Sequence, residues 1–385
     1  MMKTFLENDS RKNELYKQVY RHIHKRNLVS KADLINLVQT KPTTMTRILD
    51  ELLENGLIKE GGLGPSSGGR PPILYKINES AAWLIGVDIS RTETRIVLTD
   101  LTFAIMKSHM IPMTKAHTPD VVFAEIHEVI HKWLHQYKIS FAQLLGIGVG
   151  AVGPILRSEG TLLHPESFLA KGWERVSIPE QLSRFPVRII VDNGANSGAA
   201  SEFFVHREMY RRILYCIMGF GIRCGFLYEG SPFYTGKGDA SALGHIIVKA
   251  DGKICICGKQ GCLTAYSSYP AMLDEYKRAT GLEIDIGQLV KLVKAGDRTA
   301  LFIAKKSAYY LGVGLANMMN ALGPDLIVLH GMLVYETDFF FEETVTSARA
   351  HTFMPETVST LFKKGSLKEE AIALGAAIQV YESYF

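Results

Sequence analysis

Apolar residues recur at helical spacing in the first part of the chain. Leu15, Val19 and Ile23 lie four residues apart and predict a first helix. Ser30 can cap a second helix, because its hydroxyl can accept a hydrogen bond from a backbone N–H at the helix start. A third helix is expected over about residues 42–55, between a proline that suits a first turn and an Asn-Gly pair that ends a helix. Three short helices therefore open the sequence.

The third helix has two different faces. Its inward face is an apolar stripe, Met45, Ile48, Leu49 and Leu52. Its outward face carries short polar side chains and one arginine, namely Thr43, Thr44, Thr46 and Arg47. Such side chains at a helix start can contact phosphates and base edges when the helix lies in the major groove of DNA. We therefore expect this helix to be a recognition helix.

Two short strands are expected after the third helix. The segments LIKEG and ILYKIN flank a loop rich in Gly, Ser and Pro, GLGPSSGGRPP. Three helices followed by such a hairpin are typical of a winged helix-turn-helix domain, to which we assign residues 1–78. Arg70 lies in the loop, where a slender cationic side chain can enter a narrow minor groove. The alternative is a three-helix module with a solvated loop and no role in DNA binding.

The pattern changes at about residue 83. Three consecutive strands are predicted, then a helix near residues 119–137 and a further apolar strand; the strand segments are LIGVDI, RIVLTDL, IMKSHMIPM and LLGIGVGA. A second set contains RILYCIMGF, GFLYEG, a helix near residues 303–321 and DLIVLHG. Two similar sets of strands and helices predict an α/β body, residues 79–385, with two lobes and a cleft between them.

The charge is unevenly distributed along the chain. Residues 1–78 contain thirteen Lys or Arg and eight Asp or Glu, which gives +5, so the rest carries −1 of the total of +4. A basic head on a nearly neutral body favours a polyanionic partner such as double-stranded DNA. No stretch of about 18 apolar residues is free of charge, and no apolar signal segment opens the sequence. We therefore expect no membrane contact and a cytoplasmic location.

Three of the five cysteines lie close to one histidine. The stretch GHIIVKADGKICICGKQGCL contains His245 and the three cysteines. In a reducing cytoplasm, clustered cysteines favour a metal site over disulfides. Cys216 and Cys224 lie in strand-like segments instead, and we expect them in the core.

Several of these segments together resemble the ROK family of repressors, open reading frames and sugar kinases. The resemblance rests on the wing, on LIGVDISRTETRIVLTDL, on VDNGANSGAASE, and above all on Gly-His followed by Cys-x-Cys-Gly-x-x-Gly-Cys. It implies an actin-like fold with two ribonuclease H-like lobes and sugar-related ligands in the cleft. It also implies homodimers or tetramers, and a winged helix-turn-helix in the regulator branch.

The histidine and cysteines match the preferences of zinc. Zn²⁺ prefers four nitrogen or sulfur ligands in a tetrahedron, and His245, Cys255, Cys257 and Cys262 supply one imidazole and three thiolates. Four protein ligands leave no position for a reactive water, so we expect a structural zinc that holds the His245 segment beside the cleft. The alternative is ordinary packing of four buried residues.

The positions that ROK kinases use for catalysis are altered in this chain. Their general base is an Asp directly after an Asn, whereas here Asn193 is followed by Gly194. Loss of a general base alone lowers a rate by about 10²–10⁴. The two Glu residues that hold sugar hydroxyls in the kinases correspond to Ala242 and Thr264. We therefore expect no catalytic residue, and we expect the neighbouring Asp192 to point to the other side of the chain.

Two phosphate-binding loops have also lost glycines. The family's Asp-x-Gly-Gly-Thr corresponds to DISRT, and its Gly-Thr-Gly-x-Gly to GFGIR. Bulky side chains at these positions obstruct the approach of a phosphate to backbone N–H groups. Arg91 and Arg223 could instead hold an anionic effector such as a sugar phosphate. The alternative is a structural ion pair with Asp88 or Glu93.

These inferences combine into one functional hypothesis. We expect a transcriptional repressor of carbohydrate metabolism genes that binds an inverted-repeat operator as a homodimer or tetramer and responds to a small carbohydrate-like effector. The expected effector contacts are Asn193, Gly194, Ala242, His245, Thr264, Arg91 and Arg223. The alternatives are a residual ATP-dependent sugar kinase and a DNA-binding protein whose body only dimerises.

Overall fold

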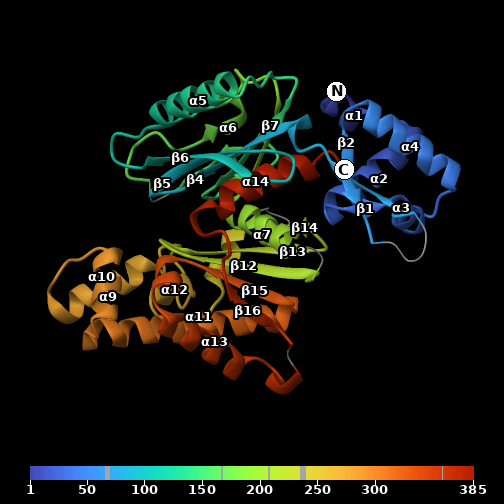
Figure 1. The fold of residues 1–385 in the computed structure, drawn as a ribbon. Helices are drawn as coiled ribbons and strands as arrows, with labels where there is room; N and C mark the ends of the chain where they lie inside the picture. The colour runs from blue at the N-terminus through green and yellow to red at the C-terminus, as the bar shows by residue number, and fades with distance from the viewer. Residues whose placement is uncertain (66–69, 166–167, 207–208, 235–239, 358) are drawn as a thin grey trace.

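The chain forms a small N-terminal head and a body of two lobes (Figure 1). The computed structural model describes residues 1–65, 70–165, 168–206, 209–234, 240–357 and 359–385. The N and C termini both lie near the place where the head meets the first lobe (Figure 1). Within these residues, no helix is both long and apolar enough to cross a membrane.

The head contains the three predicted helices and the predicted hairpin. Its elements are α1 (Met2–Glu7), α2 (Arg11–Arg26), β1 (Val29–Ser30), α3 (Lys31–Val38), α4 (Pro42–Glu54), β2 (Ile58–Leu63) and β3 (Ile73–Ile77). A capping box starts α3, because the Ser30 hydroxyl accepts from the Asp33 N–H and the Asp33 carboxylate accepts from the Ser30 N–H. α1 and the short β1, which pairs with β3, were not predicted.

The first lobe is built on a mixed sheet in the order β11-β7-β4-β5-β6. The strands are β4 (Trp83–Ile89), β5 (Glu93–Thr99), β6 (Ile105–Pro112), β7 (Leu144–Ala151) and β11 (Arg188–Asn193). α5 (Pro119–Gln136) packs on one face and α14 (Ala371–Glu382) on the other. Gly86 and Gly148 allow α14 to approach, because a β-carbon on them would lie 1.8 and 1.9 Å from backbone oxygens of α14. A small sheet and one short helix follow β7, namely β8 (Ile155–Leu156), β9 (Thr161–Leu162), β10 (Val176–Ser177) and α6 (Ile178–Gln181).

The second lobe repeats the sheet of the first, in the order β14-β13-β12-β15-β16. In both lobes the first strand is central, pairs antiparallel with the next strand and pairs parallel with a later one. The strands are β12 (Arg212–Met218), β13 (Ile222–Tyr228), β14 (Ser231–Pro232), β15 (Leu326–His330) and β16 (Leu361–Lys364). The prediction of two similar α/β lobes is therefore confirmed. Cys216 and Cys224 are buried opposite each other in β12 and β13, as predicted.

Most of the remaining helices pack on one face of the second sheet. They are α8 (Thr264–Ser267), α9 (Tyr269–Thr280), α10 (Ile286–Lys294), α11 (Arg298–Leu322), α12 (Met332–Glu336) and α13 (Asp338–His351), with 3₁₀ turns η2 (Ala240–His245), η3 (Pro355–Thr357) and η4 (Lys368–Glu370). α11 is longer than the predicted helix near residues 303–321. It begins earlier because the Asp297 carboxylate accepts a hydrogen bond from the Ala300 N–H and caps the helix.

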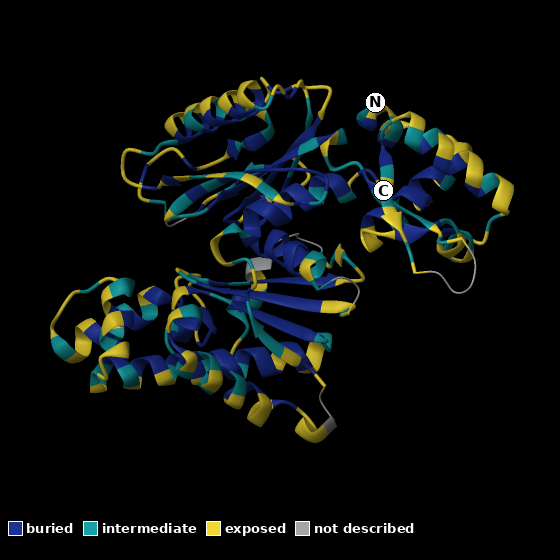
Figure 2. Cartoon of the chain, in the orientation of Figure 1, coloured by how far each residue is buried: buried dark blue, intermediate teal, exposed yellow. Residues whose placement is uncertain are grey.

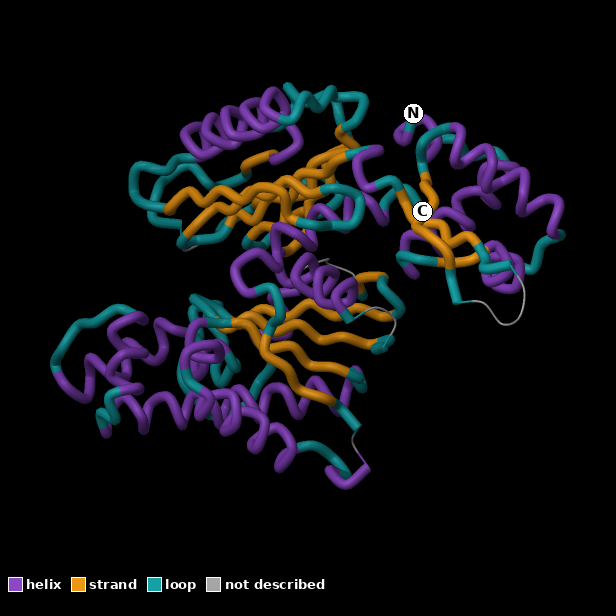
Figure 3. The backbone as a smooth tube through the Cα atoms, in the orientation of Figure 1, coloured by secondary structure: helices purple, strands orange, loops and turns teal. Residues whose placement is uncertain are grey.

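Two helices fill the space between the two sheets (Figure 3). α7 (Gly194–Val205) packs on β12 and β13, α14 packs on the first sheet, and the two helices pack on each other. Both are buried along most of their length (Figure 2). The lobes therefore meet through this pair of helices.

The head and the first lobe share one hydrophobic core. Tyr20 and Ile23 of α2 belong to the same buried cluster as Leu84 of β4 and Tyr381 of α14. His24 stacks on Tyr381 with 4.5 Å between ring centroids. The head is therefore packed against the body through α2 and α14.

Candidate functional site

The four predicted DNA-contact residues of the third helix lie together on the outer face of α4. Thr43, Thr46 and Arg47 are exposed and Thr44 is half-buried, whereas the predicted apolar stripe is buried. Pro42 occupies the first turn, as predicted, and its carbonyl oxygen accepts a hydrogen bond of 2.9 Å from the Thr46 hydroxyl. The face therefore offers hydroxyl and guanidinium groups to a groove, and their contact with DNA stays a prediction.

Two lysines beside this face were not selected from the sequence. Lys41 is exposed at the N-cap of α4, and Lys31 at the start of α3 contacts the Thr46 hydroxyl. A cation at a helix N-terminus adds to the anion-binding capacity of the backbone N–H groups there. The available signal was a lysine beside the predicted start of each of these two helices.

Arg70 lies at the end of the wing loop and is exposed. β2 and β3 pair antiparallel with a register shift between Glu60 and Leu63. The Gly64 N–H donates a 2.8 Å hydrogen bond to the Pro72 oxygen and closes the hairpin. The loop residues 66–69 lie outside the described residues. Minor-groove contact by Arg70 stays a prediction.

The predicted metal ligands come together between η2 and α8. One donor atom from each of His245, Cys255, Cys257 and Cys262 lies within 4.8 Å of the other three. The Cys257 and Cys262 sulfurs are 3.6 Å apart, and the Cys255 sulfur lies 3.5 Å from His245 Nδ1. Zinc–sulfur bonds of about 2.3 Å in a tetrahedron place two sulfurs about 3.8 Å apart. The donor set and its spacing therefore fit a tetrahedral ion such as Zn²⁺.

Gly244 and Thr264 connect the metal loop to the second sheet. The Thr264 hydroxyl donates to the Gly244 oxygen (2.8 Å) and accepts from the Ile222 N–H of β13 (3.4 Å). A β-carbon on Gly244 would lie 1.9 Å from the Ile222 oxygen, so the close approach requires glycine. Ala242 is exposed in the same segment. Three predicted effector contacts, Ala242, His245 and Thr264, are thus held in one region.

Asn193 and Gly194 lie at the start of α7, also against β13. Asn193 is buried, and its side-chain oxygen caps the helix by accepting a 2.9 Å hydrogen bond from the Ala195 N–H. A β-carbon on Gly225 of β13 would lie 2.2 Å from the Ala195 oxygen. The two groups of predicted effector contacts therefore adjoin the same strand.

A cavity of 670 Å³ lies between the two loops that resemble phosphate loops. Asp88 and Arg91 line it from the first lobe, and Phe220 and Arg223 line it from the second. Arg91 and Arg223 therefore reach one cavity. Three lysines that sequence reasoning missed also line it, namely Lys291, Lys294 and Lys368. Four carboxyl side chains line the cavity as well, and one of them, Glu336, pairs with Lys294 at 2.7 Å, so five cations face four carboxyl groups.

Asp88 is a buried carboxyl in the wall of this cavity. Burial raises its pKa from 3.8 to about 7, and the positive charge of Arg223 limits the rise. Glu93 pairs with Arg95 at 2.9 Å. The charge of Arg223 therefore acts on Asp88, in line with the ion-pair alternative, while a third arginine engages Glu93.

His330 ends β15 in the same cavity and was also missed. The hydroxyls of Tyr215 and Tyr335 lie 2.9 and 2.8 Å from its Nδ1. Burial, together with the positive charge of Arg223, lowers the pKa of His330 from 6.5 to about 4, so the ring is neutral at physiological pH. The sequence signal was a polar residue at the carboxyl end of an apolar strand, where ligands bind in α/β sheets.

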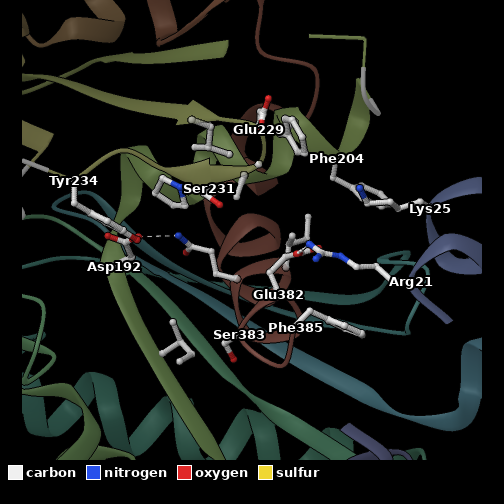
Figure 4. Close-up of a pocket in the computed structure, with 18 of the residues that line it drawn as sticks. Arg21, Lys25, Asp192, Phe204, Glu229, Ser231, Tyr234, Glu382, Ser383 and Phe385 are labelled. Atoms are coloured by element: carbon white, nitrogen blue, oxygen red, sulfur yellow. Dashed lines mark hydrogen bonds and ion pairs between the residues drawn. The ribbon is translucent and has the colours of Figure 1, made fainter. Parts of the chain in front are cut away.

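Asp192 points away from the Asp88 cavity, as predicted. Its Oδ2 accepts 2.8 Å hydrogen bonds from the Tyr234 hydroxyl and from the Gln379 amide. It lines a second cavity, of 480 Å³, together with Arg21 of the head and Glu382 of α14 (Figure 4). We call this second cavity the seam cavity.

Known proteins are similar to this chain over nearly its whole length. A sequence model of the ROK family matches residues 84–382. The xylose repressor of Caldicellulosiruptor bescii is 25% identical over 370 residues, which are 92% of each chain. The glucokinase of Halalkalibacterium halodurans is 29% identical over 272 residues, which are 66% of this chain and 81% of that enzyme.

One solved structure is similar to this chain in the fold of both the head and the body. The structure described as a ROK family transcriptional regulator, a homologue of the Escherichia coli MLC protein, superimposes with a TM-score of 0.78 and 21% identity. The match covers 96% of both chains. The predicted two-lobed body with a winged helix-turn-helix head is therefore confirmed as a fold.

Proposed function

Because this chain belongs to the ROK family, we propose that it is a DNA-binding transcriptional regulator of carbohydrate metabolism genes, and that it acts as a repressor. The observation that carries this proposal is the presence of a winged helix-turn-helix head on the ROK body. Repressor relatives match head and body together, whereas the glucokinase relative covers 66% of the chain. We expect it to act in the cytoplasm, where its operator lies.

The head is proposed to bind double-stranded DNA. α4 enters the major groove with Thr43, Thr44, Thr46 and Arg47, and Arg70 reaches the adjacent minor groove. A homodimer or tetramer presents two such heads, so the operator is an inverted repeat. Thr43, Thr46 and Arg47 are exposed on one face of α4, and Arg70 is exposed in the wing, which supports the assignment.

The body is proposed to bind a small carbohydrate-like effector between its lobes. Asn193, Gly194, Ala242, His245 and Thr264 adjoin the region around β13. An anionic part of the effector reaches the two arginines of the 670 Å³ cavity, Arg91 and Arg223. Effector binding favours one arrangement of the lobes and so changes the spacing of the two heads.

A structural zinc is proposed to hold this region. His245 and the three cysteines bind the ion and leave no position for a reactive water. When bound, the zinc supplies only rigidity. Gly244 and Thr264 transmit the position of the loop to β13 through the two hydrogen bonds of the Thr264 hydroxyl.

Sugar phosphorylation is not proposed. The general base of ROK kinases is replaced by Gly194, and the loops facing the 670 Å³ cavity carry Phe220 and Arg223 where small residues would expose backbone N–H groups to phosphate.

Two measurements on the full chain test the proposed function. The first is selection of binding sites from random DNA at a stated salt concentration, which should recover an inverted repeat. The second is a thermal-shift screen of pentoses, hexoses and their phosphates, in which a binding sugar should raise the melting temperature and change DNA affinity. Failure to recover any repeat, with or without sugars, contradicts the proposal. A sugar that shifts melting without changing DNA affinity contradicts the effector role.

A further inference from the structure

The seam cavity lies where three parts of the chain meet. Arg21 of α2 comes from the head, Gln379 of α14 from the first lobe, and Ser231 of β14 from the second lobe (Figure 4). Its volume of 480 Å³ falls in the range of about 300–1,000 Å³ that is usual for small-molecule sites. It shares no lining residue with the 670 Å³ cavity between the lobes. It is therefore a separate space from the proposed effector site.

One part of the seam cavity wall is apolar. Aromatic rings and aliphatic side chains line this part, namely Phe203, Phe204, Leu227, Pro232 and Ile378. Phe203 and Phe204 are only half-buried. Covering their remaining surface by the carbon skeleton of a ligand would be favourable, because apolar area is removed from water.

The acidic residues of the cavity already have donors. Asp192 accepts four hydrogen bonds, two on each carboxylate oxygen, and two of these come from Tyr234 and Gln379. Burial and the negative charge of Asp192 raise the pKa of Tyr234 above its ordinary value, so its hydroxyl remains a donor. Glu229 pairs with Arg211. These carboxylates are thus poorly placed to bind a further cation.

The cationic residues are arranged differently. The Arg157 side chain is exposed, and its guanidinium lies 3.4 Å above the centre of the Tyr234 ring, which holds the charged group at the cavity. Arg21 pairs with Glu382 through one terminal nitrogen, whereas its Nε–H is buried and makes no hydrogen bond among the described residues. The Arg21 side chain lines the cavity and is 39% exposed, so an anionic group in the cavity can contact its guanidinium.

We propose that the seam cavity binds a small organic anion, with its acidic group at Arg21 and Arg157 and its apolar body against Phe203, Phe204 and Ile378. The acidic group is a carboxylate or a phosphate ester. Because Arg21 belongs to the head, the ligand also stabilises one position of the head on the body. The binding step does not depend on the proposed function, whereas the effect on DNA binding rests on it.

The test uses the full chain and the fluorescent sulfonate 8-anilinonaphthalene-1-sulfonate, with uncharged N-phenyl-1-naphthylamine as its comparison. The sulfonate should bind with one site per chain, at least about tenfold more tightly than the amine. Ser231→Trp, a change at an exposed position, should fill the cavity and remove this site. The matched control Ser359→Trp, at an exposed position that lines neither cavity, should not. Unchanged binding in Ser231→Trp overturns the proposal.

A second pair of variants tests the role of charge. Arg157→Met should weaken the sulfonate at least about tenfold and leave the amine unchanged, because only the sulfonate uses the guanidinium. Arg184→Met removes an exposed arginine that lines neither cavity and should change neither probe. Equal weakening of both probes, or of neither, in Arg157→Met overturns the anion assignment. Displacement of the sulfonate by benzoate or by phenyl phosphate then distinguishes the two kinds of acidic group.

The effect on the head is measured as a change in operator affinity. Saturating sulfonate should shift DNA affinity in the unmodified protein and in Ser359→Trp, but not in Ser231→Trp. Binding of the sulfonate with no shift in any of these proteins refutes the coupling. If selection from random DNA recovers no operator, the proposed function is refuted. The fluorescence results then still decide whether the cavity binds an anion.

Discussion

Replacing Asp88 by asparagine should stabilise the protein at neutral and alkaline pH. The Asp88 carboxyl is 7% exposed, and its pKa is raised from 3.8 to about 7, mainly by burial. A carboxyl with a raised pKa prefers to be protonated in the folded state, so stability is lost as pH rises from the unfolded pKa to the folded one. Asparagine has nearly the same shape and does not ionise, so Asp88→Asn removes this loss.

The magnitude follows from the difference between the two pKa values. One pKa unit corresponds to about 1.4 kcal/mol. A rise from 3.8 to about 7 therefore costs about 4 kcal/mol at pH 8 and about 2 kcal/mol at pH 5, and nothing below the unfolded pKa, where both states are protonated. Asp88→Asn should raise the free energy of unfolding by up to these amounts.

Urea unfolding at pH 5 and pH 8, followed by tryptophan fluorescence, measures the effect. Asp325→Asn is a control of opposite sign. Burial alone would raise the pKa of Asp325, but hydrogen bonds from Arg212 lower it, so its stabilisation is fully present at both pH values and is lost only on stronger acidification. Asp325→Asn should therefore destabilise equally at pH 5 and pH 8. A lower unfolding free energy for Asp88→Asn at pH 8, or a change that is the same at both pH values, would refute the reasoning.

Three further predictions concern the metal, the chemistry and the DNA. The purified protein should contain about one zinc per chain, and Cys257→Ser should lose the metal and melt at a lower temperature; elemental analysis below a tenth of an equivalent after metal-replete expression would remove the site. Gly194→Asp should show no sugar kinase activity in a coupled ADP-release assay, because the phosphate loops remain obstructed. A β-carbon at position 194 would have its nearest neighbour, Ile372, at 3.3 Å. Turnover in this variant would show that the loops do accept ATP. Arg47→Ala should cost about 1–3 kcal/mol of DNA binding and relax one or two positions per half-site, whereas Arg70→Ala should lose preference only for flanking A·T pairs. Site selection with each variant checks this, and even weakening across all sequences would assign Arg47 to phosphate contact.

Several of the helices and strands could be predicted because their signals are local. The apolar stripe of α4 repeats within a few residues, and Pro42 and Ser30 act on the first turn of their own helices. The metal ligands were also predictable, because Cys255, Cys257 and Cys262 lie within eight residues and a shared ion limits how such a loop folds. Short-range patterns therefore indicated both the fold class and the donor set.

The features that the sequence did not indicate depend on distant pairs of residues. Arg21 pairs with Glu382, which lies 361 positions away in the sequence. No local sequence pattern identifies either residue as the partner of the other. His330 lies in the 670 Å³ cavity because β15 pairs with β12, a pairing that joins strands more than a hundred residues apart. The seam cavity and the shared core of α2 and α14 arise from the same long-range packing, which local patterns in a single sequence do not specify.

The shared core of head and body has a consequence for the synthesis of the protein. α2 leaves the ribosome before its partner α14, which is translated more than 300 residues later. At about 5–20 residues per second, His24 of α2 waits tens of seconds for Tyr381, the ring on which it stacks. A chain interrupted before α14 keeps this face of its head open to chaperones and proteases. Translation order thus leaves this face of the head without its α14 contacts until most of the body has been made.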